Sequence, residues 1–254
     1  MMEPAAFTGL DSLEELVLSN NVITSLERGM FDGLESLEEL QLDNNTINLM
    51  EDRIFEHMGR LQRLDLSHND ISVLTPETLQ GLTGLRYLNL HNNSMAIIGN
   101  RAFSHVTQLR RLDLSSNRIE QISALAFAGL VHLTHLNLQD NIIARIDHST
   151  PMVLASLPAL FSLNLKNNRL NTLNQQTFAP FWNSTVNTNA QIHLAGQFRS
   201  RLPISLFFLF LFLFLFLFLF LFLPLSSKLH PTPNSITHVL IQEGDLEKEL
   251  EDPS

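Results

Sequence analysis

The chain has 254 residues, a formal net charge of −10 and no cysteine. The missing thiols exclude disulfide frameworks, cysteine-ligated metal sites and thiol catalysis. The acidic balance argues against a general nucleic-acid binder, which needs a basic face to replace phosphate counterions. The first ten residues, MMEPAAFTGL, lack a charged start followed by an apolar stretch, so no signal peptide is visible in this chain.

One eleven-residue pattern occurs seven times along the chain. It begins as LEELVLSNNVI at Leu13 and returns every 24 residues as far as Leu133, and a longer interval of 27 residues precedes LFSLNLKNNRL at Leu160. In each copy, two leucines that alternate with polar residues predict a short strand with one buried face. Because one unit cannot bury its leucines alone, the copies predict a stack in which neighbours cover each other.

The consensus L-x-x-L-x-L-x-x-N-x-L resembles that of the leucine-rich repeat family, from about Met2 to Phe181. The 24-residue period, with Ala-Phe-x-x-Leu in the second half of the unit, is similar to the typical class in extracellular and cell-surface proteins, such as the ectodomains of Toll receptors, Slit and chaoptin. The resemblance implies an α/β repeat fold, a horseshoe-shaped solenoid. We expect a parallel sheet on its concave side and short helical or 3-10 turns on its convex side.

Two further positions recur from unit to unit. An asparagine follows each predicted strand, where its amide can donate and accept hydrogen bonds as the chain turns away. Stacked units would place these amides in a ladder formed by Asn21, Asn45, Asn69, Asn93, Asn117, Asn141 and Asn168. A phenylalanine recurs in the second half of the unit, and we expect a spine of rings from Phe7, Phe31, Phe55, Phe103, Phe127 and Phe178, with Leu79 replacing one ring.

The pattern divides the chain into four parts. Residues 1–198 form the solenoid of about seven full repeats, which starts in the middle of a unit and shows no caps. Residues 199–205 form a linker, residues 206–223 a run of leucine and phenylalanine, and residues 224–254 a disordered acidic tail. In the longer unit, Pro151 occupies the phenylalanine position, so we expect a loop there. The alternative is a bend of the solenoid or an inserted segment that binds a ligand.

The run from Leu206 to Leu223 contains only leucine and phenylalanine. As a helix it would be about 27 Å long, close to the roughly 30 Å core of a bilayer, so we predict one transmembrane helix. Arg199 and Arg201 before the run would place the repeats in the cytoplasm. The family resemblance and three possible N-glycosylation sites favour extracellular repeats, which we expect; the sites are Asn44, Asn92 and Asn183.

An alternative to a transmembrane helix is that the end of the chain does not come from a normal coding exon. Alternating leucine and phenylalanine codons are what a pyrimidine-rich tract would encode, and such tracts lie near the ends of introns. The chain after roughly Gly196 would then come from an unspliced intron or an alternative exon, and the product would be truncated. Transcript sequencing across the codons for Ala195 to Phe198 distinguishes the two interpretations.

The surface that remains for binding is the concave face of the sheet. Side chains that flank the buried leucines point outward there, and tyrosine and arginine dominate the hot spots of protein interfaces. We expect a protein ligand centred on Tyr87 and Arg111, on a surface formed by Arg63, Asp65, Arg86, Tyr87, Asn89, Arg110, Arg111, Asp113 and His135. The alternative is that Arg63 and Arg111 only balance Asp65 and Asp113 across the strands.

We predict neither an enzyme nor a cofactor or metal site. P-loop, G-x-G-x-x-G, H-E-x-x-H and G-x-S-x-G patterns are absent. His132 and His135 should diverge at a strand entrance, and Asp65 and Asp113 should lie about 10 Å apart, whereas a retaining carboxylate pair needs about 5 Å. The function expected is a single-pass, receptor-like recognition or adhesion module. The alternative is an extracellular or cytoplasmic scaffold that does not signal.

Overall fold

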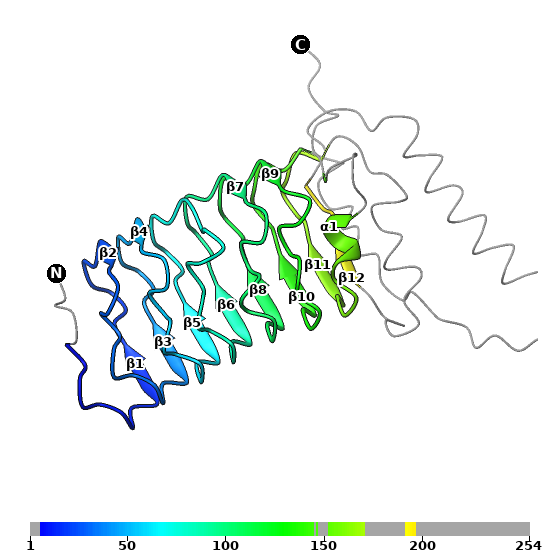
Figure 1. The fold of residues 1–254 in the computed structure, drawn as a ribbon. Coiled ribbons are helices and arrows are strands. Elements are labelled where there is room, and N and C mark those ends of the chain that lie inside the picture. The colour runs from blue at the N-terminus through cyan, green and yellow to red at the C-terminus, as the bar shows by residue number, and fades with distance from the viewer. Residues whose placement is uncertain (1–5, 145, 147–151, 171–190, 197–254) are drawn as a thin grey trace, which may run out of the picture.

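The computed structural model describes residues 6–144, 146, 152–170 and 191–196, which form a stack of similar units (Figure 1). One short strand from each unit contributes to a single parallel sheet along one side of the stack. The predicted parallel-sheet solenoid is therefore confirmed. In sheet order the strands are β1 (Glu15–Val17), β3 (Glu39–Gln41), β5 (Arg63–Asp65), β6 (Tyr87–Asn89), β8 (Arg111–Asp113), β10 (His135–Asn137), β11 (Ser162–Asn164) and β12 (Gln191–His193).

The period of the sequence determines the register of the sheet. Leu40 pairs with Leu64, one period later, so leucine stacks on leucine from strand to strand. The longer unit keeps this register, because His135 of β10 pairs with Ser162 of β11. Its extra residues are therefore accommodated outside the sheet.

The core lies between the sheet and the outer segments of the units. Leu40, Leu64 and Leu88 are fully buried, because units on both sides cover them. Leu16 and Leu18 in the first unit are only partly buried, since no described unit covers their other side. The burial of each leucine thus depends on its neighbouring units, as expected for a linear array.

Phenylalanine rings stack along the core on the side away from the sheet. The ring centroids of Phe7 and Phe31 are 6.3 Å apart, and those of Phe31 and Phe55 are 5.9 Å apart, with nearly parallel planes. Phe103 and Phe127 form a second stacked pair at 5.9 Å. Leu79, fully buried, occupies the intervening position and divides the spine into two parts.

The unit with Leu79 approaches its predecessor closely on the outer side. A Cβ atom added to Gly81 would lie 2.2 Å from the carbonyl oxygen of Phe55, whereas one added to the equivalent Gly129 would lie 3.8 Å from the carbonyl oxygen of Ser104. Both glycines have positive φ, 101° and 94°. Gly81 therefore serves both a left-handed turn and a close backbone contact.

The outer segments agree with the prediction only in part. The described repeated units have no helices there and instead have separate single turns, each closed by an i+3 to i hydrogen bond like that of a 3-10 turn. Examples are Leu34 N–H to Phe31 O and Leu37 N–H to Leu34 O. Gly33, with φ of 91°, lies inside the first turn and prevents a continuous helix. Two pairs of two-residue strands add to these segments: β2 (Ser25–Leu26) with β4 (Leu49–Met50), and β7 (Ile97–Ile98) with β9 (Gln121–Ile122). The only helix in the described residues is α1 (Met152–Ala155), in the longer unit.

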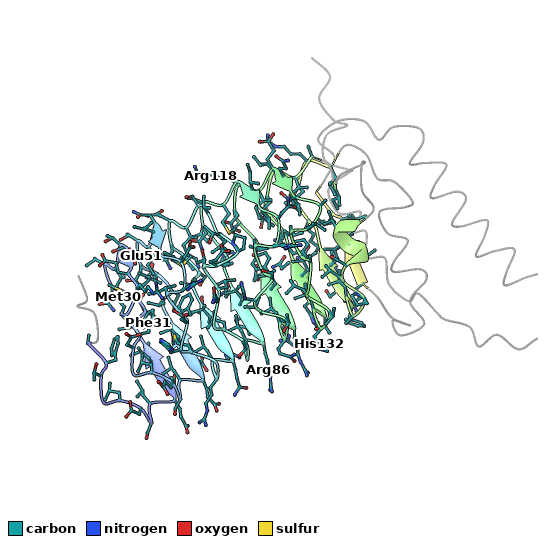
Figure 2. The ribbon with its side chains drawn as sticks, in the orientation of Figure 1. Met30, Phe31, Glu51, Arg86, Arg118 and His132 are labelled. Atoms are coloured by element: carbon teal, nitrogen blue, oxygen red, sulfur yellow. The ribbon has the colours of Figure 1, made fainter. Side chains whose placement is uncertain are left out.

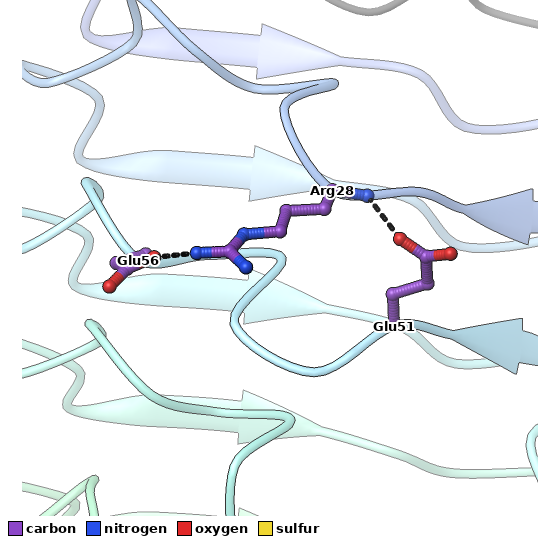
Figure 3. A network of polar contacts seen from close by, with 3 residues as sticks. All are labelled: Arg28, Glu51 and Glu56. Atoms are coloured by element: carbon purple, nitrogen blue, oxygen red, sulfur yellow. Dashed lines mark hydrogen bonds and ion pairs between the residues drawn. The ribbon is translucent and has the colours of Figure 1, made fainter.

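Arg28 connects two neighbouring units on the outer side (Figure 3). Its backbone N–H donates to Glu51 Oε2 at 2.8 Å, and its Nη2 donates to Glu56 Oε2 at 2.9 Å. The arginine side chain is 59% exposed, and an ion pair as exposed as this one contributes at most about 1 kcal/mol. The stack is therefore stabilised mainly by its core and by its backbone hydrogen bonds.

Among the described residues, no helix has the length and apolarity needed to cross a bilayer. Several expectations lie outside the described residues: the linker at 199–205, the predicted transmembrane helix at Leu206–Leu223 and the acidic tail at 224–254. The loop at Pro151 and the ring of Phe178 also lie outside them. These expectations stay predictions.

Candidate functional site

The asparagines that follow the strands join neighbouring units. Asn117 Nδ2 donates to the carbonyl oxygens of Leu114 and Ser115 in its own unit and to that of Leu90 in the preceding unit, at 2.9 to 3.1 Å. Its Oδ1 accepts the N–H of Met95 at 3.0 Å. The same four bonds recur at Asn45, Asn69, Asn93, Asn141 and Asn168.

Asn21 is the exception in this ladder. It is exposed, and its Nδ2 donates only to Leu18 and Ser19 of its own unit. The difference arises because no described unit precedes it. The amides of the other six asparagines are used within the chain, which makes them structural rather than ligand-binding groups.

A second row of hydrogen bonds crosses the exposed face of the sheet, and the sequence analysis missed it. Asp65 Oδ1 accepts the N–H and the hydroxyl of Ser67, and its Oδ2 accepts Asn89 Nδ2 at 3.0 Å. Asp113 binds Ser115 and Asn137 in the same way. The signal in the sequence was the alternation of aspartate and asparagine from unit to unit, with a serine two residues after each aspartate.

This row changes the interpretation of three predicted ligand-binding residues. Asp65 and Asp113 use their carboxylate oxygens on their own chain, and Asn89 donates to Asp65 while its Oδ1 accepts the N–H of His91. The same side chains are therefore less available to a ligand than their position on the sheet face suggested.

Arg63 is also occupied within the chain. Its Nε lies 3.4 Å from Glu39 Oε1, and its guanidinium carbon lies 5.0 Å from the centroid of the Tyr87 ring. The partner of Arg63 in the structure is thus Glu39 on the preceding strand rather than Asp65. A cation held over an aromatic face also restricts the motion of that ring.

Tyr87, Arg111 and His135 occupy the same position on consecutive strands β6, β8 and β10. With Asp113 they line a shallow, open depression that extends to His193. Burial and the carboxylates of Asp65 and Asp113 raise the pKa of Tyr87, whereas burial and the Arg111 guanidinium lower the pKa of His135. At neutral pH the tyrosine and the histidine are therefore uncharged, and Arg111 provides the positive charge beside them.

Backbone hydrogen bonds join three arginines at one peptide group. The carbonyl oxygen of Arg86 accepts the backbone N–H of Arg110 at 2.9 Å and that of Arg111 at 3.1 Å. All three side chains are exposed, and within the described part of the chain none has an ion pair or a side-chain hydrogen bond. We refer to Arg86, Arg110 and Arg111 as the arginine cluster.

His132 and His135, three residues apart in the sequence, have different surroundings. His132 is exposed and lies at the same margin of the stack as Arg86 (Figure 2), whereas the His135 ring packs at 5.9 Å from that of Phe161. Within the ranges that the structure describes, no three histidine, aspartate or glutamate side chains converge as metal ligands do.

Two of the possible glycosylation sites lie on exposed turns. Asn44 and Asn92 have φ of 54° and 52°, one repeat unit lies between them, and both are exposed. Asn44 Nδ2 donates to Asn20 Oδ1 at 2.6 Å, and Asn92 contacts the ring of His68. Asn183 lies outside the described residues.

Comparison with known families agrees with this geometry. The family model described as leucine rich repeat matches residues 1–47, 36–95 and 96–143. These ranges cover more than half of the chain and include the sheet strands from β1 to β10. No curated protein matches the sequence significantly.

Proposed function

Because the chain belongs to the leucine-rich repeat family, we propose that it binds a protein ligand through the exposed face of its parallel sheet. This face extends across consecutive units, and two hollows on it, which meet at Tyr87, are open and shallow. A broad and shallow surface suits a protein partner, whereas small molecules are bound in concave pockets that cover most of their surface.

The observation that carries this proposal is the position of Tyr87 next to Arg111. The ring of Tyr87 is half-buried and is restrained by Arg63 on one side, while the Arg111 guanidinium on the other side has no partner among the described residues. A restrained aromatic side chain loses little conformational entropy when it is covered by a ligand. Tyrosine and arginine at the centre of a contact are also the residue types that contribute most to binding.

We place this recognition module at the cell surface, as part of a receptor-like or adhesion protein with a single membrane span. Three features support the placement: the resemblance to cell-surface repeats, the exposed sequons at Asn44 and Asn92, and the apolar run Leu206–Leu223. The competing function is a scaffold in which the same face holds partners together without signalling.

Proximity labelling on intact cells tests the proposal with the full chain. A membrane-impermeant labelling reagent should tag surface proteins that contact the wild-type chain, and Tyr87→Ala should lose those partners. Val73→Ala is the matched control, since Val73 is 68% exposed and lies outside the sheet. Recognition lies elsewhere on the molecule if Tyr87→Ala and Val73→Ala retain the same partners.

The same cells distinguish a surface protein from a cytoplasmic scaffold. Glycans are added only on the lumenal side of the membrane, so a chain with extracellular repeats should lose mass at Asn44 and Asn92 on treatment with an endoglycosidase. Asn44→Gln with Asn92→Gln and Asn183→Gln provides the unglycosylated reference. A wild-type chain that migrates with this reference before treatment would support the scaffold in the cytoplasm.

A further inference from the structure

The arginine cluster is a concentration of positive charge in an acidic protein. The chain has a formal net charge of −10, yet Arg86, Arg110 and Arg111 meet around a single peptide group. These backbone bonds place three positive side chains at neighbouring positions, where like charges repel one another and the repulsion is only partly screened by water and salt. A ligand of opposite charge would relieve this repulsion.

The described acidic side chains of the neighbouring strands form no ion pair with the cluster. Glu39 forms the ion pair with Arg63, two strands away from Arg111 in the sheet. Asp65 and Asp113 accept hydrogen bonds from serines and asparagines. The three guanidinium groups therefore keep their donors for a group that comes from outside the described residues.

We propose that the arginine cluster binds an acidic segment of the protein ligand, whose carboxylates pair with Arg86, Arg110 and Arg111 beside Tyr87. This inference rests on the function proposed above and specifies the chemistry of its partner. The planar guanidinium group presents paired N–H donors that match both oxygens of a carboxylate. Tyr87 adds an uncharged ring and hydroxyl next to the charged contact, so an apolar or polar residue that flanks the acids would also be covered.

The inference excludes Arg63 from the contact, although Arg63 lies on the same face. Its charge already interacts with Glu39, and its planar group lies over Tyr87. Arg63 also restrains Tyr87, so it does not serve as a control. Arg118 does, because it is the same residue type, is exposed and lies outside the strands of the sheet.

A direct binding assay tests the inference. The full chain in detergent micelles is titrated into a short fluorescent peptide of alternating glutamate and glycine, and a peptide with glutamine in place of glutamate serves as the neutral control. The glutamate peptide should bind, and more weakly at high salt, whereas the glutamine peptide should not. Arg110→Gln with Arg111→Gln should weaken binding by about tenfold or more, and the control Arg118→Gln by no more than about twofold.

Three results would overturn the inference. The first is that the glutamate peptide does not bind, and the second is that Arg118→Gln weakens its binding as much as the double variant does. The third concerns the acidic tail of the chain itself: if Glu247→Gln with Glu249→Gln and Glu251→Gln strengthens peptide binding by more than about threefold, the tail occupies the cluster in place of an external partner.

Proximity labelling separates failure of this inference from failure of the proposed function. If Arg110→Gln with Arg111→Gln keeps the surface partners that Tyr87→Ala loses, the sheet face binds a protein but the acidic segment is not part of the contact. If Tyr87→Ala keeps all partners, the proposed function itself is wrong.

Discussion

Asn117 Oδ1 accepts the backbone N–H of Met95 at 3.0 Å, and this bond crosses the boundary between two units of the stack. On the same boundary, Asn117 Nδ2 donates to the carbonyl oxygen of Leu90 at 2.9 Å. One side chain thus satisfies a donor and an acceptor that belong to the preceding unit. Because the amide is buried, water does not replace these bonds when the side chain is changed.

Asn117→Leu should therefore destabilise the protein. The change leaves the buried N–H of Met95 unpaired, and we expect a loss on the order of 1–3 kcal/mol. The carbonyl oxygens of Leu90, Leu114 and Ser115 each lose one bond but still accept from Asn93, Asn141 and Asn92. Urea denaturation of the full chain, followed by circular dichroism, measures the effect. Asn21→Leu is the control, because Asn21 is exposed and bonds only to its own unit; an equal loss in the two variants would show that the ladder does not hold the units together.

Gly81→Ala should cost more stability than Gly129→Ala. Both residues have positive φ, so both variants incur a left-handed strain of roughly 1–2 kcal/mol. Only at Gly81 does the new methyl group also meet backbone, 2.2 Å from the carbonyl oxygen of Phe55. We expect an additional cost of about 1–3 kcal/mol from this overlap, measured as the difference between the two melting curves. Equal melting temperatures would show that the two units are not in such close contact.

The row of aspartates and asparagines on the sheet face predicts that exchanging Asp113 and Asn137 restores the stability that either single change loses. Asp113→Asn places an amide donor against the donor of Asn137 and should cost about 1 kcal/mol of stability, because one hydrogen bond is lost. Asn137→Asp alone places two carboxylates opposite each other and should also destabilise. The double variant exchanges donor and acceptor and should recover most of the loss. Additive effects in this double-mutant cycle, measured by denaturation, would contradict the bond.

His135 and His193 should titrate below the ordinary histidine pKa of 6.5. Burial and then the Arg111 cation lower the pKa of His135, and burial and then Lys166 lower that of His193. Arg111→Gln should raise the pKa of His135 and leave that of His193 unchanged, as followed by NMR of the imidazole protons. If both histidines shift together, or neither does, Arg111 is not the neighbour that acts on His135.

The same shifts determine how stability depends on pH. As the pH falls through about 6.5, these histidines accept protons in the unfolded chain while they stay neutral in the folded protein. The free energy of unfolding should therefore decrease on acidification from neutral pH. His135→Gln should make this decrease smaller, which denaturation curves at a series of pH values can measure.

Much of the fold was predictable because the repeat is a local property of the chain. The alternation of Leu40 and Leu42 with polar residues specifies a strand with one buried face, and the 24-residue period specifies the register in which Leu40 meets Leu64. The outer segments were less predictable. Their turns depend on left-handed glycines and on the distance between units. The glycines recur in the repeat at Gly9, Gly33, Gly81 and Gly129, but His57 and His105 replace them in two units, and the distance between units has no signal in the sequence.

The sequence alone determined that the units stack, that their leucines face inward and that Tyr87, Arg111 and His135 lie side by side on the opposite face. Only the tertiary structure decided which of the exposed side chains form hydrogen bonds or ion pairs within the chain. Asp65 binds Ser67 and Asn89, Arg63 binds Glu39, and Arg111 has no partner within the described residues. The physical reason is that each exposed side chain has candidate partners on two neighbouring strands about 4.8 Å away. Side-chain geometry selects among these partners, and the residue types alone do not specify which partner is chosen.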